Sequence, residues 1–340
     1  MNAFFLVKNG PSSSAFELRE VETPKPDKGQ VLIKVEAFGL NFADVMARKG
    51  LYREAPPLPC VIGYEVVGRI EALGPETSDL TTGQRVVAFT RFGAYAEYAL
   101  TDHRAVTPIP EDMDNGVAAA LATQYCTAYY SAYEMVNLHP GERVLVQAAA
   151  GGVGSAIVQL AKRKGCIVFG TAGSDKKLDY LRSIGCDYPI NYRKEDFVAA
   201  VKRELKGERL DAAFDSIGGS TYKKSRKLLG AAGRMVNYGA AQRSSKKGGI
   251  FGVLKLVFGF GFIHPIGLIV KSQAAIGVNM LRVADYKPHI VQRCMQEVVK
   301  LTEQGELKPH VGGRYKADKL ADAHDFLEGR GSIGKIVVEW

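Results

Sequence analysis

The feature that most constrains the fold is a regular alternation of short apolar runs and amphipathic segments between residues 144 and 238. The apolar runs have the length of buried strands, and the segments after them have helical periodicity. Parallel strands need crossover connections over the faces of their sheet, and helices usually supply them. The sequence therefore predicts an α/β fold with a doubly wound parallel sheet. The expected strands are 144–147, 166–170, 188–190, 212–215 and 233–238, and the expected helices are 155–164, 176–184, 196–205 and 220–229.

The region before this alternation has a different pattern. Up to about residue 120, short apolar or alternating runs are separated by glycine, proline and aspartate, which indicates a β-rich unit. Near the end of the chain, 287–304 is amphipathic, and 333–339 is typical of a last strand that returns to the first unit. We therefore expect two domains, one made of residues 1–123 and 282–340 and the other of residues 124–281.

A glycine-rich turn joins the first strand of the alternation to the helix after it. The turn contains Gly151, Gly152, Val153 and Gly154, with Ala149 where the first glycine of a G-x-G-x-x-G motif usually stands. A strand, a tight turn and a helix let backbone N–H groups and the helix dipole meet a pyrophosphate. The same residues could form an ordinary strand-to-helix connection. The surrounding alternation favours dinucleotide binding.

The end of the second strand, residues 170–173, carries no acidic side chain. A carboxylate there would bind the ribose 2′-hydroxyl of NAD(H) and repel a 2′-phosphate. The donors Ser174 and Lys177 follow instead, which favours NADP(H), with Lys177 as the main candidate ligand of the phosphate. Asp175 is a contrary detail, and Ser174 with Asp175 could equally cap the next helix.

The net charge of +9 is concentrated in one part of the chain. Residues 155–255 hold 21 Lys or Arg and 9 Asp or Glu, a local charge of +12. Such a field could attract a phosphorylated cofactor, an anionic lipid or nucleic acid. Because no aromatic and basic recognition motif accompanies it, we do not expect nucleic-acid binding. The five widely spaced cysteines fit neither a disulfide framework nor a zinc knuckle, and the N-terminus lacks a secretion signal, so we expect a cytoplasmic protein.

The stretch 250–270 is apolar apart from Lys255 and His264 and is interrupted by glycines and Pro265. A charge inside a spanning helix is costly, and the length is marginal for a bilayer, so a membrane span is disfavoured. A cap over a pocket, a dimer contact and a peripheral membrane contact stay open, with the first two favoured.

Several separated motifs resemble the medium-chain dehydrogenase/reductase superfamily over nearly the whole chain. Within it, they are similar to the zinc-free quinone oxidoreductase (zeta-crystallin) branch, and residues 42–48, 56–59 and the apolar stretch before Val278 are most similar to the vesicle amine transport protein subgroup. The resemblance implies a GroES-like catalytic domain and a Rossmann NADP(H)-binding domain. The motifs of the branch lie at 39–44, 50–52, 63–68, 83–86 and 93–98.

The zinc-dependent relatives place a cysteine where this chain has Asn41 and a histidine where it has Tyr64. Without a thiolate and an imidazole at these points, we expect no metal site. The resemblance implies hydride transfer from NADPH to a quinone or an α,β-unsaturated carbonyl, with Asn41, Tyr52 and Tyr64 as candidate donors to the charge on the carbonyl oxygen. Asn41 could instead be a turn residue, and the two tyrosines could be core aromatics.

The resemblance also implies further cofactor ligands and partners. Thr127 would lie near the nicotinamide, Tyr192 beside the adenosine phosphate, and Asn237 and Gly239 at the end of a strand. The edge strand at 275–279 implies a homodimer. The six histidines show no metal-ligand spacing, so surface or capping roles are expected. The alternative function is a weakly catalytic NADPH-binding protein that uses the stretch 250–270 to act at a membrane surface or on a protein partner.

Overall fold

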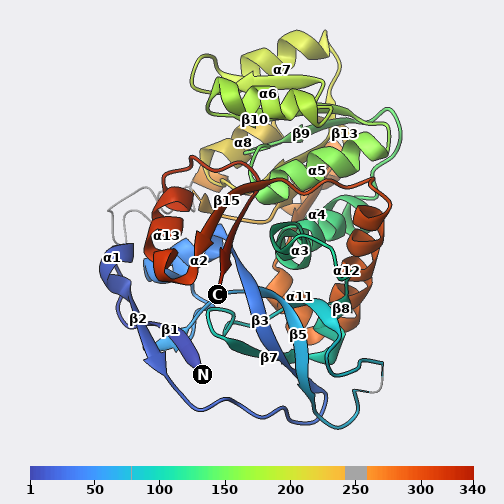
Figure 1. Cartoon of the computed structure of the whole chain (residues 1–340). Coiled ribbons are helices and arrows are strands. Elements are labelled where there is room, and N and C mark those ends of the chain that lie inside the picture. Colours follow the sequence, from blue (N-terminus) through green and yellow to red (C-terminus); the bar gives the residue numbers. More distant parts are fainter. Residues whose placement is uncertain (78, 242–258) are drawn as a thin grey trace. The chain divides into compact units, whose positions relative to one another are not determined.

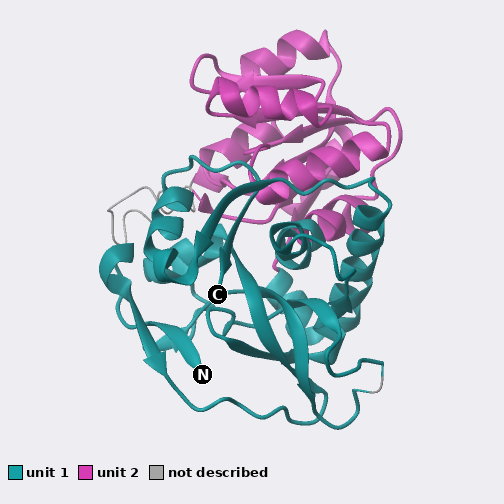
Figure 2. Cartoon of the chain, viewed as in Figure 1, with its two compact units in different colours: residues 1–126, 280–340 teal, residues 127–279 magenta. Residues whose placement is uncertain are grey.

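The computed structural model describes residues 1–77, 79–241 and 259–340. The chain divides into two compact units, one of residues 1–126 with 280–340 and the other of residues 127–279 (Figure 2). The sequence analysis placed the domain boundaries at 123/124 and 281/282. These boundaries stay a prediction, because compact units are not by themselves evidence of domains that fold independently. Part of the apolar stretch singled out above, residues 250–258, lies outside the described residues.

Unit 2 contains a six-stranded sheet in which every pair of neighbours is parallel (Figure 1). The strand order is β11-β10-β9-β12-β13-β14, so the order reverses beside the first strand of the unit. This is the doubly wound sheet that the alternation predicted. The strands are β9 (Arg143–Val146), β10 (Ile167–Ala172), β11 (Tyr188–Asn191), β12 (Leu210–Asp215), β13 (Leu229–Asn237) and β14 (Ala274–Gly277). The helices are α5 (Gly152–Arg163), α6 (Asp175–Ser183), α7 (Phe197–Leu205), α8 (Ser220–Arg226) and α10 (Pro265–Lys271).

Burial explains why the strands of unit 2 are short continuous apolar runs. Leu145, Phe169 and Met235 belong to one buried cluster between the sheet and its helices. A parallel sheet covered on its faces leaves no solvent-facing position for alternating polar residues. Several predicted boundaries are wrong. Helix α5 begins at Gly152 and not at residue 155. The helix expected at 220–229 ends at Arg226, and the strand expected from residue 233 begins at Leu229, because Leu229 already pairs with Leu210.

Unit 1 is rich in β-structure, as expected. A seven-stranded sheet has the order β15-β16-β3-β5-β6-β8, with β7 paired to β3, and a smaller sheet has the order β2-β1-β4. The last strand of the chain pairs antiparallel with β3, which confirms that the C-terminus returns to the first unit. The strands are β1 (Asn2–Leu6), β2 (Phe16–Glu20), β3 (Gln30–Leu40), β4 (Cys60–Val61), β5 (Glu65–Leu73), β6 (Arg85–Phe89), β7 (Tyr98–Asp102), β8 (Val106–Pro108), β15 (Val311–Lys316) and β16 (Lys335–Glu339).

The remaining helices lie before β9 or after β14 in the sequence. The amphipathic segment predicted at 287–304 is α12, which begins with Pro288 at a position where a missing N–H costs nothing. The helices are α1 (Ser12–Ala15), α2 (Phe42–Arg48), α3 (Asn115–Ala120), α4 (Cys126–Tyr129), α11 (Met280–Tyr286), α12 (Pro288–Glu303) and α13 (Leu320–Glu328), with shorter or wider turns at His103–Ala105, Leu121–Tyr125, Tyr130–Met135 and Ala317–Lys319.

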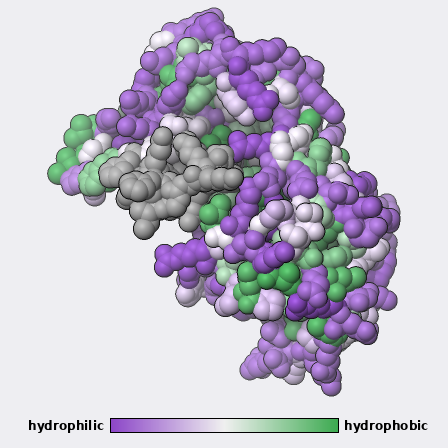
Figure 3. Space-filling model, turned by 90° about the vertical axis from the view of Figure 1, so that its left-hand side faces the viewer, coloured by the Kyte–Doolittle hydropathy of each residue, from purple (hydrophilic) through white to green (hydrophobic). Residues whose placement is uncertain are grey.

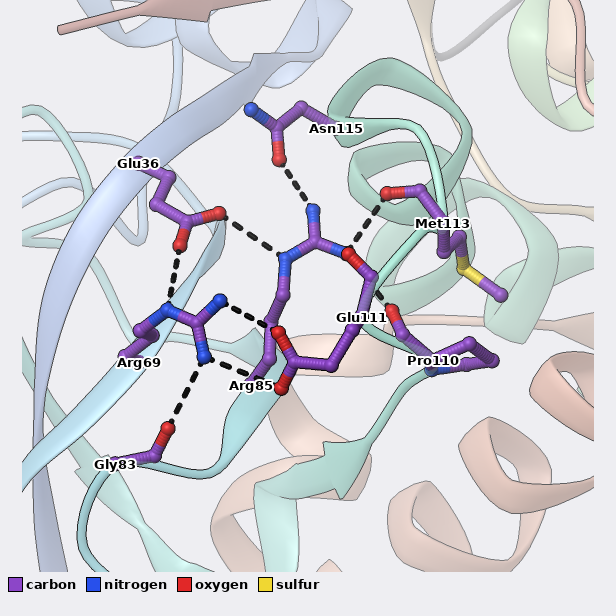
Figure 4. Close-up of polar contacts among 8 residues, drawn as sticks. All are labelled: Glu36, Arg69, Gly83, Arg85, Pro110, Glu111, Met113 and Asn115. Carbon is purple, nitrogen blue, oxygen red and sulfur yellow. Dashed lines mark hydrogen bonds and ion pairs between the residues drawn. The ribbon is translucent and has the colours of Figure 1, made fainter.

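A cluster of charged residues around Arg85 ties β6 to the segment before α3 (Figure 4). The Nε atom of Arg85 lies 3.1 Å from Glu36, and its other nitrogens donate to Asn115 and to backbone oxygens, including that of Met113 at 2.8 Å. Arg69 joins the cluster through Glu36. These contacts satisfy a buried guanidinium and fix a loop, which is a structural role.

One histidine corrects the sequence prediction. His324 is fully buried, and its Nε2 lies 3.1 Å from the Tyr95 hydroxyl. Burial, with a smaller effect of the nearby Arg48, lowers the pKa of His324 to about 3, so the ring is neutral at ordinary pH. The expectation of a surface or capping role is therefore wrong for this residue. It holds for His264, whose side chain accepts from the Ile266 N–H at the start of α10.

The surface of unit 2 exposes an apolar helix. In the view of Figure 3, hydrophobic residues form small green groups on a mostly hydrophilic face. In α10, Ile266, Ile269 and Val270 are 63%, 77% and 78% exposed, and Phe262 just before the helix is 90% exposed. No helix within the described ranges is both long and apolar enough to cross a membrane.

Candidate active site

The glycine turn of unit 2 is held by bonds between the ends of β9 and β10. The Ala149 N–H donates to the Thr171 carbonyl at 2.9 Å, and the Thr171 hydroxyl donates to Gln147 Oε1 at 2.7 Å. Helix α5 begins at Gly152, and Gly151 precedes it without a capping side chain. The first backbone N–H groups of α5 are therefore open to an external anion, as a pyrophosphate site requires.

Gly154 is the position of closest approach between the helix and the turn. A Cβ atom on this residue would overlap the Ala148 carbonyl oxygen and would lie 2.8 Å from Ala149 Cα. Contacts this short involve backbone, which cannot move aside. Gly154 therefore permits close packing of the helix on the strand, which is what the last glycine of a dinucleotide-binding turn does. Its place in a cofactor site stays a prediction.

The two candidate phosphate ligands after β10 lie at the start of α6. Ser174 precedes α6, and Lys177 lies partly buried in the first turn of that helix. The Asp175 carboxylate binds Lys194 at 2.7 Å and Asn191 at 3.1 Å, and these bonds lower its pKa. The charge of Asp175 is therefore paired with Lys194, and the roles of Ser174 and Lys177 as phosphate ligands stay predictions.

Two residues after β11 lie against the end of β10. A Cβ atom on Gly173 would be 2.7 Å from the Tyr192 hydroxyl and 3.3 Å from Arg193 Nε. The sequence analysis named Tyr192 as a candidate cofactor ligand and did not name Arg193. Arg193 is a further candidate, because a guanidinium is suited to bidentate phosphate binding. Both ligand roles stay predictions.

The remaining cofactor candidates of unit 2 have structural contacts. The Asn237 side chain donates to the carbonyls of Asp215 and Gly239 at 3.1 and 3.0 Å, so it ties the ends of β12 and β13 together. Thr127 is buried in α4. The strand ends put Asn237 and Gly239 at the same sheet edge as the glycine turn, and their role as ligands stays a prediction.

In unit 1, Asn41 lies at the turn between β3 and α2. Its backbone N–H donates to Asp44 Oδ2 at 2.7 Å, and its side-chain Nδ2 donates to Glu65 Oε1 at 2.6 Å. The side chain is 7% exposed. Asn41 is therefore a turn residue through its backbone, as one of the two sequence-based interpretations held. Its side-chain carboxamide also takes part in a buried polar network.

Two further residues, which the sequence analysis missed, bind the Asn41 carboxamide. Gln124 Nε2 and Lys335 Nζ donate to Asn41 Oδ1 at 3.3 and 3.2 Å. They stand 83 and 294 residues away in the sequence. No local pattern connects positions so far apart, so only the folded chain identifies them.

Tyr52 and Tyr64 meet edge to face, with ring centroids 6.1 Å apart. Tyr64 is 2% exposed, and its hydroxyl has no hydrogen-bond partner among the described residues. Burial raises the pKa of both phenols, and the negative charge of Asp44 adds to the effect. Both hydroxyls therefore remain protonated and can donate a hydrogen bond, but they do not act as bases near neutral pH.

Asp44 is fully buried beside this group. Burial raises the pKa of its carboxyl to about 8, with a further contribution from Glu65. The structure thus gives Asp44 and Glu65 the supporting role of holding Asn41. The Asn41 amide and the Tyr64 hydroxyl are each a neutral donor, the kind of group that suits an oxygen gaining negative charge.

The described residues contain no group of three or more His, Cys, Asp or Glu placed to hold a metal ion. All five cysteines are buried and free of disulfides. Burial raises the pKa of the Cys126 thiol well above its ordinary value, which makes it a poor thiolate donor.

Comparison with known proteins identifies the family. Residues 27–111 match the alcohol dehydrogenase GroES-like domain, and residues 184–338 match the zinc-binding dehydrogenase family. The parallel sheet of unit 2 and these two matches identify the chain as an oxidoreductase of the dehydrogenase class. The chain belongs to the medium-chain dehydrogenase/reductase superfamily, together with quinone oxidoreductases and VAT-1 homologs, which confirms the resemblance found in the sequence.

Three relatives illustrate the match. The chain is 35% identical over 323 residues to a synaptic vesicle membrane protein VAT-1 homolog of Danio rerio, covering 94% of this chain and 66% of that protein. It is 31% identical over 321 residues to a quinone oxidoreductase of Rattus norvegicus, covering 94% and 92%. The structure of Escherichia coli quinone oxidoreductase complexed with NADPH covers all of both chains, with a TM-score of 0.87 and 26% identity.

Proposed function

We propose that this chain is an NADPH-dependent, zinc-independent oxidoreductase that transfers a hydride to a quinone or an α,β-unsaturated carbonyl. The observation that carries the proposal is the Asn41 amide. Its Nδ2 donates to Glu65 and to no other described residue, so its second N–H is available. The position taken by a metal-binding cysteine in zinc-dependent relatives thus holds a neutral donor for the substrate oxygen.

Unit 2 supplies the cofactor site in this proposal. The glycine turn with the start of α5 receives the pyrophosphate, and Ser174, Lys177 and Tyr192 surround the 2′-phosphate. The Escherichia coli relative solved with NADPH supports the same cofactor here. When bound, NADPH supplies the hydride. Asn41 and the tyrosine hydroxyls orient the carbonyl oxygen and stabilise its negative charge, and water supplies the proton.

The proposal is tested with purified protein by following NADPH oxidation at 340 nm across a panel of quinones and enones. We expect turnover with at least one of them and an activity that persists after dialysis against a strong zinc chelator. NADPH binding without turnover on any panel member would contradict the proposed reaction. Loss of activity on chelation, with recovery on adding zinc, would contradict zinc independence.

We propose that the chain forms a homodimer through β14. This strand pairs with β13 on one side and with no strand on its other side within the described part of the chain, and its residues are largely exposed. An open edge of this kind favours pairing with a second copy. We propose a cytoplasmic location for this dimer. Light scattering on the purified protein should give twice the chain mass, and a monomer at micromolar concentration would contradict the proposed dimer.

The exposed helix α10 favours a second candidate function. The protein would keep NADPH as a bound ligand and use Ile266, Ile269 and Val270 to act at a membrane surface or on a protein partner. Sedimentation with phosphatidylserine vesicles, which is lost in the variant Ile266→Ser/Ile269→Ser, together with absence of turnover, would favour this candidate. Turnover with unchanged partitioning of the variant would favour the reductase.

A further inference from the structure

A buried pair of opposite charges contacts the Asn41 side chain. Lys335, the first residue of β16, forms an ion pair with Glu65, the first residue of β5, and neither side chain is exposed to solvent. The Lys335 ammonium also donates to the Leu40 carbonyl at 3.3 Å and to Asn41 Oδ1 at 3.2 Å. All three of these donor–acceptor contacts lie within unit 1.

The pair fixes which way the Asn41 carboxamide faces. Its oxygen accepts from the Lys335 ammonium and from Gln124, while its nitrogen donates to the Glu65 carboxylate. A rotation that exchanged the two ends of the amide would place N–H groups against an ammonium and an oxygen against a carboxylate. Both new contacts would be repulsive, so the charges permit a single orientation.

The fold makes room for this pair at one position of β3. A Cβ atom on Gly39 would overlap both the Lys335 side chain and Glu65 Oε1. Any other residue at position 39 would displace the charges from the carboxamide. The absence of a side chain at Gly39 is therefore required for the Lys335–Glu65 ion pair.

We propose that Lys335 is a positioning residue for hydride transfer, which acts through Asn41. With Glu65, it holds the carboxamide so that the unbonded N–H faces the substrate oxygen. This inference rests on the proposed function, in which Asn41 donates to that oxygen. A buried ion pair is weak evidence for a role in stability, because desolvation offsets much of its attraction. What the reaction would use is the single orientation of the Asn41 carboxamide that the ion pair permits.

The first test is a double-mutant cycle with Lys335→Met and Asn41→Ala. We expect Lys335→Met to lower kcat at least about 10-fold and to leave the Kd of NADPH within about two-fold of the wild type. In the Asn41→Ala background, the same change should alter kcat by less than about two-fold. Independent, multiplicative losses would overturn the inference, and so would an unchanged kcat in Lys335→Met.

Lys335→Met leaves Glu65 as an unpaired buried charge, so a second variant guards against misfolding. Lys335→Met/Glu65→Gln removes both charges and keeps an acceptor for Asn41 Nδ2. We expect it to fold and still to show the reduced kcat. Full recovery of kcat would mean that the pair is only structural. The matched control is Arg85→Met/Glu36→Gln, which removes the ion pair in Figure 4 and should lower the melting temperature while kcat stays unchanged.

A spectroscopic measurement separates this inference from the proposed reaction. In protein labelled with ¹⁵N-asparagine, the Asn41 side-chain signals are identified by their loss in Asn41→Ala. The two amide protons should have widely separated shifts, because one is bonded to a carboxylate. Lys335→Met should reduce that separation, and Arg85→Met should not. An Asn41 signal that is unchanged in Lys335→Met overturns the positioning role, whereas a missing NADPH turnover overturns only the proposed function.

Discussion

The two candidate sites of this protein are built from different parts of the chain. The cofactor site in unit 2 is made of backbone, with the turn at 151–154 and the uncapped start of α5 as its main features. The candidate substrate site in unit 1 is made of side chains, with Asn41 and Tyr64 as donors and Lys335 and Glu65 behind them. A backbone site depends on the absence of side chains, and a side-chain site depends on what holds each group in place.

This difference predicts different sensitivities. In unit 2, an added methyl group at the turn is more damaging than loss of any single polar side chain. In unit 1, the reverse holds, because the loss of one hydroxyl or one charge changes the chemistry while the fold remains. The following variants test this contrast.

The largest effect is expected from Gly154→Ala. The added methyl group would overlap the Ala148 carbonyl, so the turn must shift away from the pyrophosphate position. We expect the affinity for NADPH to fall more than about 100-fold, measured by quenching of protein fluorescence. Gly267→Ala in α10 is the control, because a Cβ atom there meets nothing within 4 Å. Equal affinities for the two variants would contradict the assignment of the turn.

Tyr64→Phe should separate catalysis from stability. The Tyr64 hydroxyl is buried without a described partner, so its removal should not lower stability, and kcat should fall about 10-fold. Tyr133→Phe is the control. It removes a hydrogen bond to the Leu160 carbonyl at 3.0 Å and should cost about 1 kcal/mol of stability with no change in kcat. A Tyr64→Phe enzyme with wild-type kcat would exclude this hydroxyl as a substrate donor.

Lys177→Ala should raise the Kd of NADPH about 10-fold and leave the Kd of NADH unchanged, because only NADPH carries the 2′-phosphate. Isothermal titration with both cofactors measures the two values. Lys202→Ala, at an exposed position near the end of α7, is the control for a general loss of positive charge. Equal changes for NADPH and NADH would remove the proposed contact between Lys177 and the phosphate.

The smallest effect is a change in how stability depends on pH. Burial holds the pKa of Asp44 at about 8, above its ordinary value of 3.8, so between these values the folded state binds more protons than the unfolded state. The contribution of Asp44 to the free energy of unfolding therefore decreases as pH rises from about 4 to 8. Asp44→Asn should flatten this decrease in urea unfolding at pH 5 and pH 8. An identical slope in the variant would show that Asp44 is ionised in the folded protein.

Sequence reasoning was most successful where one short segment carries the whole feature. The alternation predicted the parallel sheet, and the glycine turn predicted a strand, a turn and a helix in that order, although α5 begins at Gly152 and not at residue 155. The same reasoning was wrong about His324, because nothing in the local sequence shows that Tyr95 meets its ring. It also missed Gln124 and Lys335, whose contacts with Asn41 join distant parts of the chain. The ligand roles of Asn41, Tyr52, Tyr64 and Lys177 stay predictions.

The sequence by itself determined the nucleotide-binding sheet, because hydrophobic periodicity and a glycine turn act over a few consecutive residues, and backbone geometry follows from them directly. The tertiary structure alone decided how Asn41 is oriented. A buried ammonium and a buried carboxylate are tolerated only where the fold brings them together, and β3, β5 and β16 must pair before Lys335, Glu65 and Asn41 can meet.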